Sequence, residues 1–402
     1  MKFGGTSVGN PQSREQAVHR IRTQVEAGYD VCVVVSAMGR SGEPYATDTL
    51  LSMVRQVNED VNAQELDLAC ACGEILSSVV MTATLCRQGL QAVSLTGWQA
   101  GIITDGRFGD ARIRRVQPDF VLEHLSEGKV AVVAGFQGRT ERGEVTTLGR
   151  GGSDISAVAL GVGLAAELVE IYTDVDGVKA ADPKLVPDAS TIPVVTYEEL
   201  CQLAHEGARV VHPVAAELAM RNGLALRIRS TFEEGVGTLV TAGDVDLEPP
   251  PFGVPLRPVT AVTTMDNMAH VEIDFPAHWD SSDELRLFRL LADAHISLDM
   301  ILVTPFRKAF IVSAEKSQAT RVALEEAGFT VCITPECAKV TVVGGGMRGV
   351  PGVMVRVASA LHKADIDIIQ TADSHMSISC LIREWHMQEA VRALYRNFYL
   401  GD

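Results

Sequence analysis

The chain has 402 residues, of which 47% are apolar, and its 51 acidic against 35 basic side chains give a net charge of −16 at pH 7. This length provides buried cores for about two or three domains, and the acidic balance argues against nucleic acid as a partner. We find no run approaching the about 20 apolar residues that span a bilayer and no secretory signal, and the eight cysteines are scattered through apolar contexts, so we expect a cytoplasmic protein with reduced thiols and no membrane partner.

Residues 2–9 combine a lysine with three glycines and two hydroxyls, in the order Lys2-Phe3-Gly4-Gly5-Thr6-Ser7-Val8-Gly9. Glycine lets the backbone approach a ligand closely, and successive N–H groups in such a loop or at the start of the next helix bind anions. A lysine beside them adds a point charge for phosphate. The alternative is a surface turn before a helix, because the segment is not a GxxxxGK[ST] phosphate loop.

Residues 1–241 alternate between short apolar runs and helical patterns, which is typical of a mainly parallel sheet between helices in an α/β domain. The runs predict buried strands at 31–35, 130–134, 168–172 and 226–228, and the helical patterns lie near 11–27, 64–88, 154–166 and 213–222. Ligands bind outside the carboxyl ends of the strands in such sheets. We therefore expect the chemistry in the segments that follow the strands.

A carboxylate interrupts the apolar helical pattern between Leu66 and Val80, at Gly73-Glu74. A carboxylate in an apolar setting is either paired or bound to a ligand. As a ligand group, Glu74 would suit an ammonium; the alternative is an ion pair with an internal arginine. Ser36 and Thr47 follow the 31–35 strand and are, taken alone, ordinary loop hydroxyls.

A second glycine cluster, Gly149-Arg150-Gly151-Gly152-Ser153-Asp154, follows the 130–134 strand. Ser153 or Asp154 is a suitable N-cap for the next helix, and Arg150 can hold a carboxylate through both of its terminal nitrogens. The alternative is a capped helix with a solvated arginine. Two glycine loops, each before a helix in one α/β domain, favour a phosphate site more strongly than one.

Two aspartates follow the next strand, in the order Thr173-Asp174-Val175-Asp176-Gly177. At a carboxyl strand end they can hold Mg²⁺, its waters or a nucleotide ribose. The alternative is an Asx turn closed by Gly177; we favour a ligand role for Asp174 and leave both roles open for Asp176. Together with the lysine and the glycine loops, this indicates phosphoryl transfer to a charged small molecule, with Arg150 and Glu74 holding an amino acid.

A proline-rich connector is predicted at 242–258, and an internal repeat follows it. Two units, at 259–335 and 336–402, each have the order strand, helix, strand, strand, helix, with a period of about 70 residues that suits a duplicated ferredoxin-like α+β domain. Neither unit contains a plausible cluster of catalytic side chains. The glycine-rich loop at 344–352 is either a sharp strand-to-helix turn or a place where backbone meets a small ligand.

These motifs together resemble the aspartokinases of the amino-acid kinase family, over essentially the whole chain. The motifs that carry the resemblance are KFGGTS (Lys2 to Ser7), SA (Ser36-Ala37), GE (Gly73-Glu74), TGxQAGIxT (Thr96 to Thr104), GRGGSD (Gly149 to Asp154), TDVDG (Thr173 to Gly177) and GAxVxHP (Gly207 to Pro213). The resemblance implies an amino-acid kinase domain at 1–241, followed by two ferredoxin-like ACT domains that the repeat matches. Residues 370–375 resemble the diaminopimelate-responsive Bacillus-type branch.

The resemblance implies transfer of the ATP γ-phosphate to the β-carboxylate of L-aspartate, with Mg²⁺ as cofactor, at the start of lysine, threonine, methionine and diaminopimelate synthesis. The implied catalytic residues are Lys2, Arg150 and Asp154. The implied ATP-binding residues are Lys2, Phe3, Gly4, Gly5, Thr173, Asp174, Lys179, Lys184, Arg209 and Val210, and the implied aspartate-binding residues are Ser36, Thr47, Glu74, Arg150 and Ser153. Because a carboxylate with a pKa of about 4 is already ionised at neutral pH, we interpret Asp154 as an orienter rather than a base.

ACT domains of this family usually pair between chains, so the resemblance implies a homodimer or higher homo-oligomer. It also implies feedback by lysine, threonine or diaminopimelate, with effector contacts at Met347, Val350, Gln370 and Asp373. The chain departs from the family in lacking the longer first strand before the lysine, in having Lys179 where an aromatic is usual, and in having Lys184 where arginine is usual. The alternatives are another amino-acid kinase, such as a glutamate or acetylglutamate kinase, and a non-catalytic amino-acid sensor.

Overall fold

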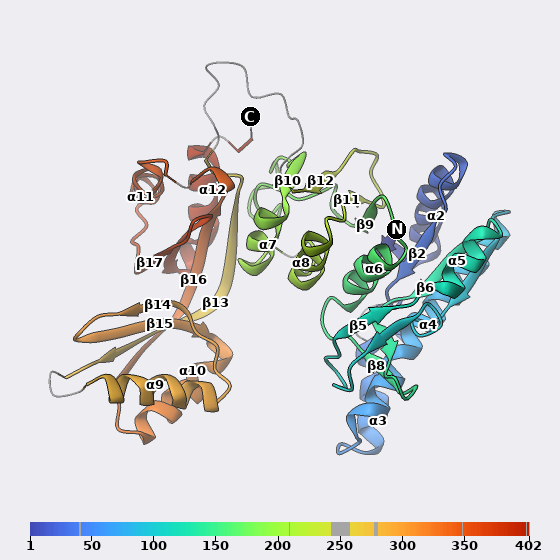
Figure 1. Ribbon diagram of the computed structural model, residues 1–402. Helices are drawn as coiled ribbons and strands as arrows, with labels where there is room; N and C mark the ends of the chain where they lie inside the picture. Colours follow the sequence, from blue (N-terminus) through green and yellow to red (C-terminus); the bar gives the residue numbers. More distant parts are fainter. Residues whose placement is uncertain are drawn as a thin grey trace. The chain divides into compact units, whose positions relative to one another are not determined.

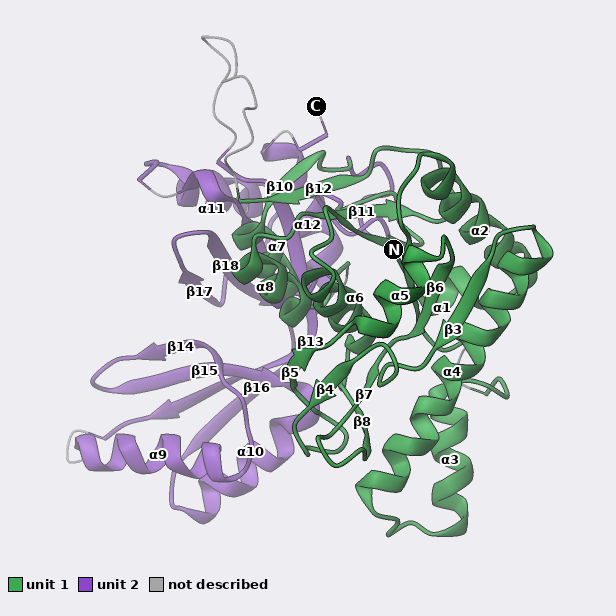
Figure 2. Cartoon of the chain, turned by 45° about the vertical axis from the view of Figure 1, so that its right-hand side comes forward, with its two compact units in different colours: residues 1–178, 191–204, 209–247 green, residues 179–190, 205–208, 248–402 purple. Residues whose placement is uncertain are grey.

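The computed structural model describes residues 1–39, 42–208, 210–242, 258–276, 280–347, 349–398 and 400–401, and it forms two compact units (Figure 2). The first unit comprises residues 1–178, 191–204 and 209–247, and the second comprises 179–190, 205–208 and 248–402. Most of the connector predicted at 242–258 lies outside the described residues. Two short segments that precede the predicted connector, 179–190 and 205–208, therefore belong to the second unit.

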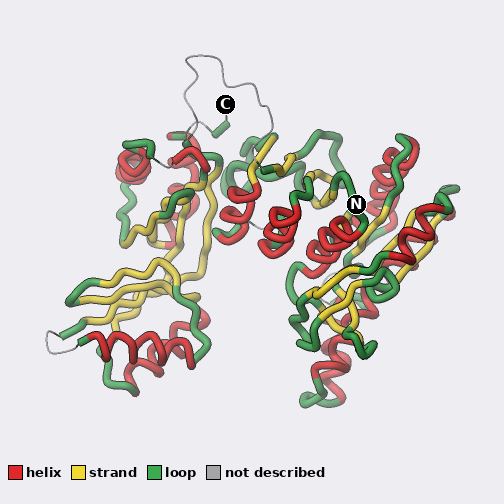
Figure 3. Tube along the Cα trace, viewed as in Figure 1, coloured by secondary structure: helices red, strands yellow, loops and turns green. Residues whose placement is uncertain are grey.

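An eight-stranded sheet forms the centre of the first unit (Figures 1 and 3). Its strands, in spatial order, are β10 (Val194–Thr196), β12 (Thr238–Thr241), β11 (Leu226–Ser230), β9 (Val169–Thr173), β1 (Lys2–Phe3), β2 (Cys32–Val35), β6 (Val130–Ala134) and β3 (Ala92–Leu95). The six strands from β11 to β3 run parallel, and β12 is antiparallel to β11. The predicted mainly parallel sheet is confirmed, and the four strands expected from apolar runs are β2, β6, β9 and β11.

The helices of the first unit include the four that the sequence predicts, which are α2, α4, α6 and α8. The set is α1 (Gly5–Val8), α2 (Pro11–Glu26), α3 (Thr47–Val57), α4 (Ala63–Arg87), α5 (Asp119–Ser126), α6 (Gly152–Gly163), α7 (Tyr197–His205) and α8 (Pro213–Asn222). A separate four-stranded sheet has the order β5 (Ile113–Val116), β4 (Ile102–Thr104), β7 (Gln137–Arg139) and β8 (Val145–Thr147). Local signals set these bounds: Asn10, for example, caps α2 by accepting from the Ser13 N–H at 2.8 Å.

Strand β1 is only two residues long but is held from both sides. It pairs in parallel with β2 and with β9, so that Lys2 lies between Val34 and Ile171. The Phe3 ring is wholly buried and stacks on Tyr172 with their centroids 4.8 Å apart. The Met1 ammonium, whose pKa is lowered by burial, donates to the Cys32 carbonyl oxygen at 2.7 Å. These contacts anchor Lys2 between its two neighbouring strands.

We expected no segment apolar enough to span a bilayer. Helix α4 differs from that expectation, because by length and composition it is apolar enough to cross a membrane. Its 25 residues include a window with a mean hydropathy of 1.6. The helix contacts β3, β6 and β8, and it carries the buried carboxylates of Asp67 and Glu74. Buried acidic side chains with specific partners are typical of a core helix. We therefore interpret α4 as the core helix of this unit.

A six-stranded antiparallel sheet forms the second unit, with helices packed on it (Figure 1). The strands, in spatial order, are β14 (Asp299–Val303), β15 (Arg307–Ser313), β13 (Ala261–Asp274), β16 (Val331–Val343), β18 (Ser377–Arg383) and β17 (Gln370–Asp373). The helices are α9 (Ser281–Asp293), α10 (Ala314–Glu326), α11 (Val353–Lys363) and α12 (Met387–Asn397), with short 3₁₀ turns at Gly345–Met347 and Glu384–His386. The duplicated α+β fold is confirmed.

The two repeats share their long strands instead of following one another as separate sheets. The second half of β13 pairs with β15, and the second half of β16 pairs with β18. The first half of β13, Ala261–Met265, pairs with Lys339–Val343 and so supplies the last strand of the second repeat. Each repeat thus completes the ferredoxin-like strand order with a strand that the other repeat also uses.

A buried lysine in β16 joins two carboxylates of the second unit. The Lys339 Nζ lies 2.7 Å from Glu206 Oε2 and 2.5 Å from Asp299 Oδ2, and the lysine side chain is 4% exposed. The Thr341 hydroxyl donates to the same Glu206 oxygen at 3.1 Å. Burial alone would lower the pKa of Lys339, but the hydrogen bonds to Asp299 and Glu206 outweigh it and leave the pKa raised. The lysine is therefore charged and fully paired.

We expect Lys339→Ala to destabilise the second unit by about 3–5 kcal/mol, because removing one partner of a buried ion pair leaves uncompensated charge. Lys339→Met, which keeps most of the volume, should be equally harmful since the two carboxylates still face each other. Scanning calorimetry of the full chain measures the effect. The exposed Lys316 is the matched control, and Lys316→Ala should change stability by less than about 0.5 kcal/mol. Wild-type stability of both Lys339 variants would contradict the pairing.

Candidate active site

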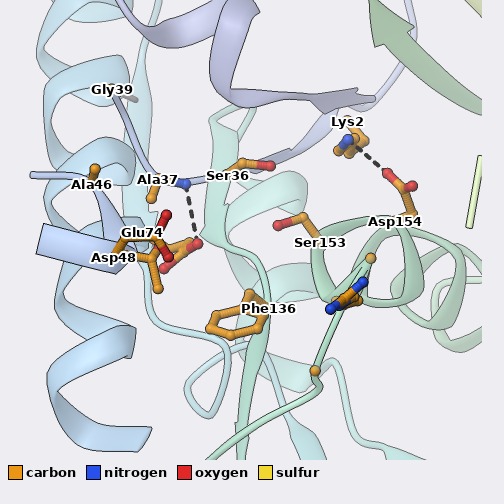
Figure 4. A pocket seen from close by; sticks show the side chains of 15 residues that line it. Lys2, Ser36, Ala37, Gly39, Ala46, Asp48, Glu74, Phe136, Ser153 and Asp154 are labelled. Carbon is orange, nitrogen blue, oxygen red and sulfur yellow. Dashed lines mark hydrogen bonds and ion pairs between the residues drawn. The ribbon is translucent and has the colours of Figure 1, made fainter. Parts of the chain in front are cut away.

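A cavity of about 370 Å³ lies where β1, β2 and β6 end (Figure 4). It is lined by residues from the two glycine loops, from α4 and from the start of α3: Lys2, Ser36, Ala37, Gly39, Ala46, Thr47, Asp48, Glu74, Phe136, Gly149, Arg150, Gly151, Gly152, Ser153 and Asp154. Figure 4 shows Lys2 and Asp154 on one side of this cavity and Glu74 on the other. The cavity thus joins segments that the sequence places far apart, at the sheet edge where ligands were expected.

The lysine of the first glycine loop is ion-paired inside the cavity. Lys2 Nζ lies 2.6 Å from Asp154 Oδ1, and the two side chains are 13% and 12% exposed. The other oxygen of Asp154 accepts from the His212 backbone N–H at 3.3 Å. Asp154 is thereby fixed by a second segment, and it holds the ammonium in one position. This arrangement fits the interpretation of Asp154 as an orienter of Lys2.

Helix α6 begins at the cavity without a side-chain cap. Its N-cap is Gly151, in the left-handed region at φ 69°, and no side chain accepts from the first turn. The expected N-cap at Ser153 or Asp154 is therefore wrong, because both residues lie inside the helix. A Cβ on Gly151 would lie 2.2 Å from the His212 ring, so a larger residue cannot fit. The uncapped positive end of a 12-residue helix is suited to bind an anion.

A buried carboxylate faces the cavity from α4. Glu74 is 4% exposed, and its Oε1 accepts from the Ala37 N–H at 3.1 Å. Among the described residues its Oε2 has no hydrogen-bond partner, and no arginine pairs with it. Burial raises the pKa of Glu74 to about 8. Of the two alternatives, the internal ion pair is thus not observed in the described structure, and a buried carboxylate with a free oxygen is suited to receive a cation from a ligand.

Comparison with known proteins assigns this chain to a family. The amino acid kinase family model matches residues 1–230, and an ACT domain model matches residues 340–398. Aspartokinase 1 of Bacillus subtilis is 42% identical over 100% of this chain and 98% of its own length. The chain belongs to the aspartokinases. An aspartokinase of Thermus thermophilus is 37% identical over 99% of this chain and 98% of its own length.

The fold is also that of solved aspartokinases. The crystal structure of Escherichia coli aspartokinase III in complex with aspartate and ADP matches 99% of both chains with a TM-score of 0.78 at 24% identity. The aspartate kinase of Clostridium acetobutylicum matches 99% of both chains with the same TM-score of 0.78 at 22% identity. These likenesses show that the fold of the solved aspartokinases extends over both units. The family model and the curated relatives, which are aspartokinases, make the chain an ATP-dependent kinase of this family.

The aspartokinase motif residues expected to bind aspartate all line the cavity. Ser36 follows β2, Thr47 begins α3, and Ser153 lies in the first turn of α6. Arg150, between two glycines with left-handed backbone, is exposed. The structure therefore brings together every residue of that group, although their contacts with aspartate stay a prediction.

The residues expected to bind ATP lie in several parts of the structure, unlike those expected to bind aspartate. Gly4 and Gly5 lie beside Lys2, since a Cβ on Gly4 would be 3.5 Å from its Nζ. The Phe3 ring is wholly buried in the core and does not line the cavity, so the ATP contact expected for Phe3 stays a prediction. Thr173 ends β9, which lies next to β1, and Asp174 follows it; the Thr173 hydroxyl donates to Asp174 Oδ1 at 3.1 Å.

Among the described residues of the ATP group, Lys2 alone lines the cavity. Lys179 and Lys184 belong to the second unit. Arg209 lies outside the described residues, and Val210 beside it is half-buried. Asp176, for which two roles were open, accepts from the Thr191 hydroxyl at 2.6 Å, a contact with a distant residue that decides between neither role.

The expected effector residues differ in exposure. Val350 and Asp373 are exposed, whereas Met347 is buried. Gln370 is buried, lies 2.9 Å from His270 Nε2 through its Oε1, and donates to the Met300 carbonyl oxygen. Its polar atoms therefore link the two repeats, and the effector role expected for Gln370 is not supported by this geometry.

Four residues of the cavity were missed by the sequence reasoning: Gly39, Ala46, Asp48 and Phe136. Phe136 has a left-handed backbone at φ 68°, and its ring lies at the cavity between Glu74 and the α6 loop (Figure 4). A non-glycine residue in this region costs about 1–3 kcal/mol and often marks a functional position. Asp48 follows Thr47 directly and also lines the cavity. No sequence signal indicates the backbone of Phe136, whereas the position of Asp48 beside Thr47 could have identified it.

Proposed function

We propose that this chain is an aspartate kinase that transfers the γ-phosphate of ATP to the β-carboxylate of L-aspartate and gives 4-phospho-L-aspartate. The observation that carries the proposal is one cavity with a held lysine and an uncapped helix end on one side, and a buried carboxylate with a free oxygen on the other. Membership of the aspartokinases supports the choice of substrate.

The substrate's three charges match the polar groups around the cavity. Glu74 would receive the α-ammonium, and Arg150 would hold the α-carboxylate through both terminal nitrogens. The hydroxyls of Ser36, Thr47 and Ser153 line the space between them. The β-carboxylate would then be directed to Lys2 and the α6 N-terminus. This arrangement uses the buried carboxylate and the exposed arginine for substrate binding and leaves the lysine for the reaction.

The chemistry needs positioning and charge neutralisation, because an aspartate carboxylate is already an anion at neutral pH. Lys2 would stabilise the charge on the transferring phosphoryl group, and Asp154 would keep its ammonium in place. Gly4, Gly5, Thr173 and Asp174 would border the nucleotide. Bound Mg²⁺ would supply further neutralisation of phosphate charge.

The donor set fits a Mg²⁺ that arrives with ATP. Among the described residues there is no group of three or more His, Cys, Asp or Glu side chains that could hold a metal. Mg²⁺ typically keeps several waters and is bound through one or two carboxylates and the substrate phosphates. The exposed Asp174 at the end of β9 is a carboxylate suited to that role.

We further propose that the protein is cytoplasmic, forms a homodimer or higher homo-oligomer through its ACT domains, and is inhibited by an end product. The match to an ACT domain model at residues 340–398 supports a regulatory part. Lysine, threonine and diaminopimelate are the effectors to titrate against activity. Lack of response to all three would contradict this part of the proposal.

A coupled assay of ADP release tests the substrate. Aspartate should support turnover, whereas glutamate and N-acetylglutamate should leave the rate near background. Preference for glutamate or acetylglutamate would assign the chain to another amino-acid kinase activity. Background turnover with every amino acid would instead indicate a non-catalytic sensor.

A further inference from the structure

A second buried carboxylate lies on the same helix as Glu74. Asp67 is 2% exposed and precedes Glu74 on α4 by two turns, so the two side chains share one helix face. A helix rises about 1.5 Å per residue, which separates the two positions by about 10 Å along a rigid axis. Asp67 is absent from the cavity lining. Its partners decide what it does.

Three donors from two different loops converge on Asp67. Its Oδ2 accepts from the Thr147 N–H at 2.8 Å and from the Gly109 N–H at 3.0 Å. Its Oδ1 accepts from the Thr147 hydroxyl at 2.8 Å. Hydrogen bonds to a charged acceptor are about twice as strong as those between neutral groups. Asp67 therefore fixes both the backbone and the side chain of Thr147.

Thr147 is the last residue of β8, directly before the loop that carries Arg150. Its carbonyl oxygen accepts from the Ala111 N–H at 2.8 Å. The segment that contains Gly109 and Ala111 therefore also holds the end of β8 at Thr147. The loop itself has left-handed backbone at Gly149 and Gly151. Glycines give a loop extra conformational freedom. The position of Arg150 thus depends on how firmly the start of its loop is held.

We propose that Asp67 is a positioning residue that acts through Thr147 to place Arg150 opposite Glu74. Helix α4 then carries one substrate-binding carboxylate and also holds the anchor of the arginine loop. The relative placement of the groups for the ammonium and the α-carboxylate is then set by one rigid element, which fixes the orientation of the bound amino acid. This inference rests on the proposed function, because it assumes that Arg150 and Glu74 hold an amino acid.

Steady-state kinetics of Asp67→Ala and Asp67→Asn in the full chain tests this positioning role. Displacement of a substrate-holding group by about 1 Å can cost about 10²-fold in rate, and we expect Asp67→Ala to lower kcat/KM for aspartate to that extent, chiefly through KM. The KM for ATP should stay within about twofold. Asp67→Asn keeps one acceptor oxygen and should lie between wild type and alanine.

A double-mutant cycle shows whether Asp67 acts through Arg150 or only stabilises the fold. If Asp67 acts through Arg150, then Asp67→Ala should change the KM for aspartate by less than about twofold in an Arg150→Ala background. Ser78→Ala is the matched control on α4, because the buried Ser78 hydroxyl donates only to the Ile75 carbonyl oxygen of its own helix. It should leave both KM values unchanged. Thr147→Val, which keeps the backbone N–H, replaces Asp67→Ala if that variant does not fold.

Additive effects in the cycle or parallel increases in both KM values would overturn the inference. A wild-type enzyme that does not phosphorylate aspartate would overturn the proposed function instead, so the two failures are distinguishable.

Discussion

Replacement of Lys2 by alanine is expected to lower kcat for aspartate phosphorylation by more than about 10²-fold, the scale of a lost charge-stabilising donor. Lys2 is the cation that the structure places at the cavity on a fixed carboxylate, 2.6 Å from Asp154. The loss should fall mainly on kcat, because the charge that Lys2 stabilises grows as the phosphoryl group transfers. A coupled ADP-release assay under saturating ATP and aspartate measures it.

Two comparisons make the Lys2 result specific. Lys129, which pairs with Glu127 at the surface at 2.5 Å, is the matched control, and Lys129→Ala should leave kcat unchanged. Asp154→Asn keeps the size of the orienting side chain but removes its charge, and it should lower kcat by less than Lys2→Ala does. A thermal melt shows whether the Lys2 variant is folded. A folded Lys2→Ala enzyme with near-normal kcat would remove Lys2 from the mechanism.

The value of kcat/KM for aspartate is expected to rise with pH and to level off above about pH 8. Burial raises the pKa of Glu74 to about 8, so the free enzyme holds this group as a neutral acid below that pH. Because the ammonium of aspartate needs the carboxylate form, each unit of pH below the pKa should cost about tenfold in kcat/KM. Glu74→Gln should remove this rise and lower the plateau by about 10²-fold, as expected for a lost buried charge pair.

Calorimetry tests the same carboxylate without turnover. At neutral pH, binding of aspartate should release close to one proton from Glu74, since the bound cation stabilises the ionised carboxylate. Titrations in buffers of different ionisation enthalpy measure that release. Glu65, exposed in the first turn of α4, provides the matched control, and Glu65→Gln should keep both the release and the pH profile. A flat profile between about pH 6 and about pH 9 in the wild type would show that Glu74 does not bind the ammonium.

The sequence predicted the parallel sheet well because its strands are encoded locally. The apolar runs that became β2 and β6 need no knowledge of distant residues, and the residues after them do lie at the cavity. The glycine loops were equally informative, since close approach of backbone to a ligand or to another segment requires glycine. At Gly151 that segment proved to be the His212 ring, which nothing near Gly151 in the sequence indicates.

Long-range contacts account for what the sequence could not predict. Ser153 and Asp154 resemble N-caps, but Asp154 is held by Lys2 and His212 and lies inside the helix. The sequence also could not show that β13 and β16 each serve both repeats. The residues of a half-strand are the same whichever repeat the half-strand completes. Asp67 gives no local signal of its bonds to Thr147, which lies 80 residues away.

The most direct test of the account is trapping of the product with hydroxylamine. Wild-type enzyme with ATP and aspartate should yield the β-hydroxamate of aspartate in step with ADP, and Lys2→Ala should yield almost none. Release of ADP without hydroxamate, or equal trapping with glutamate, would contradict a cavity built to phosphorylate the β-carboxylate of aspartate.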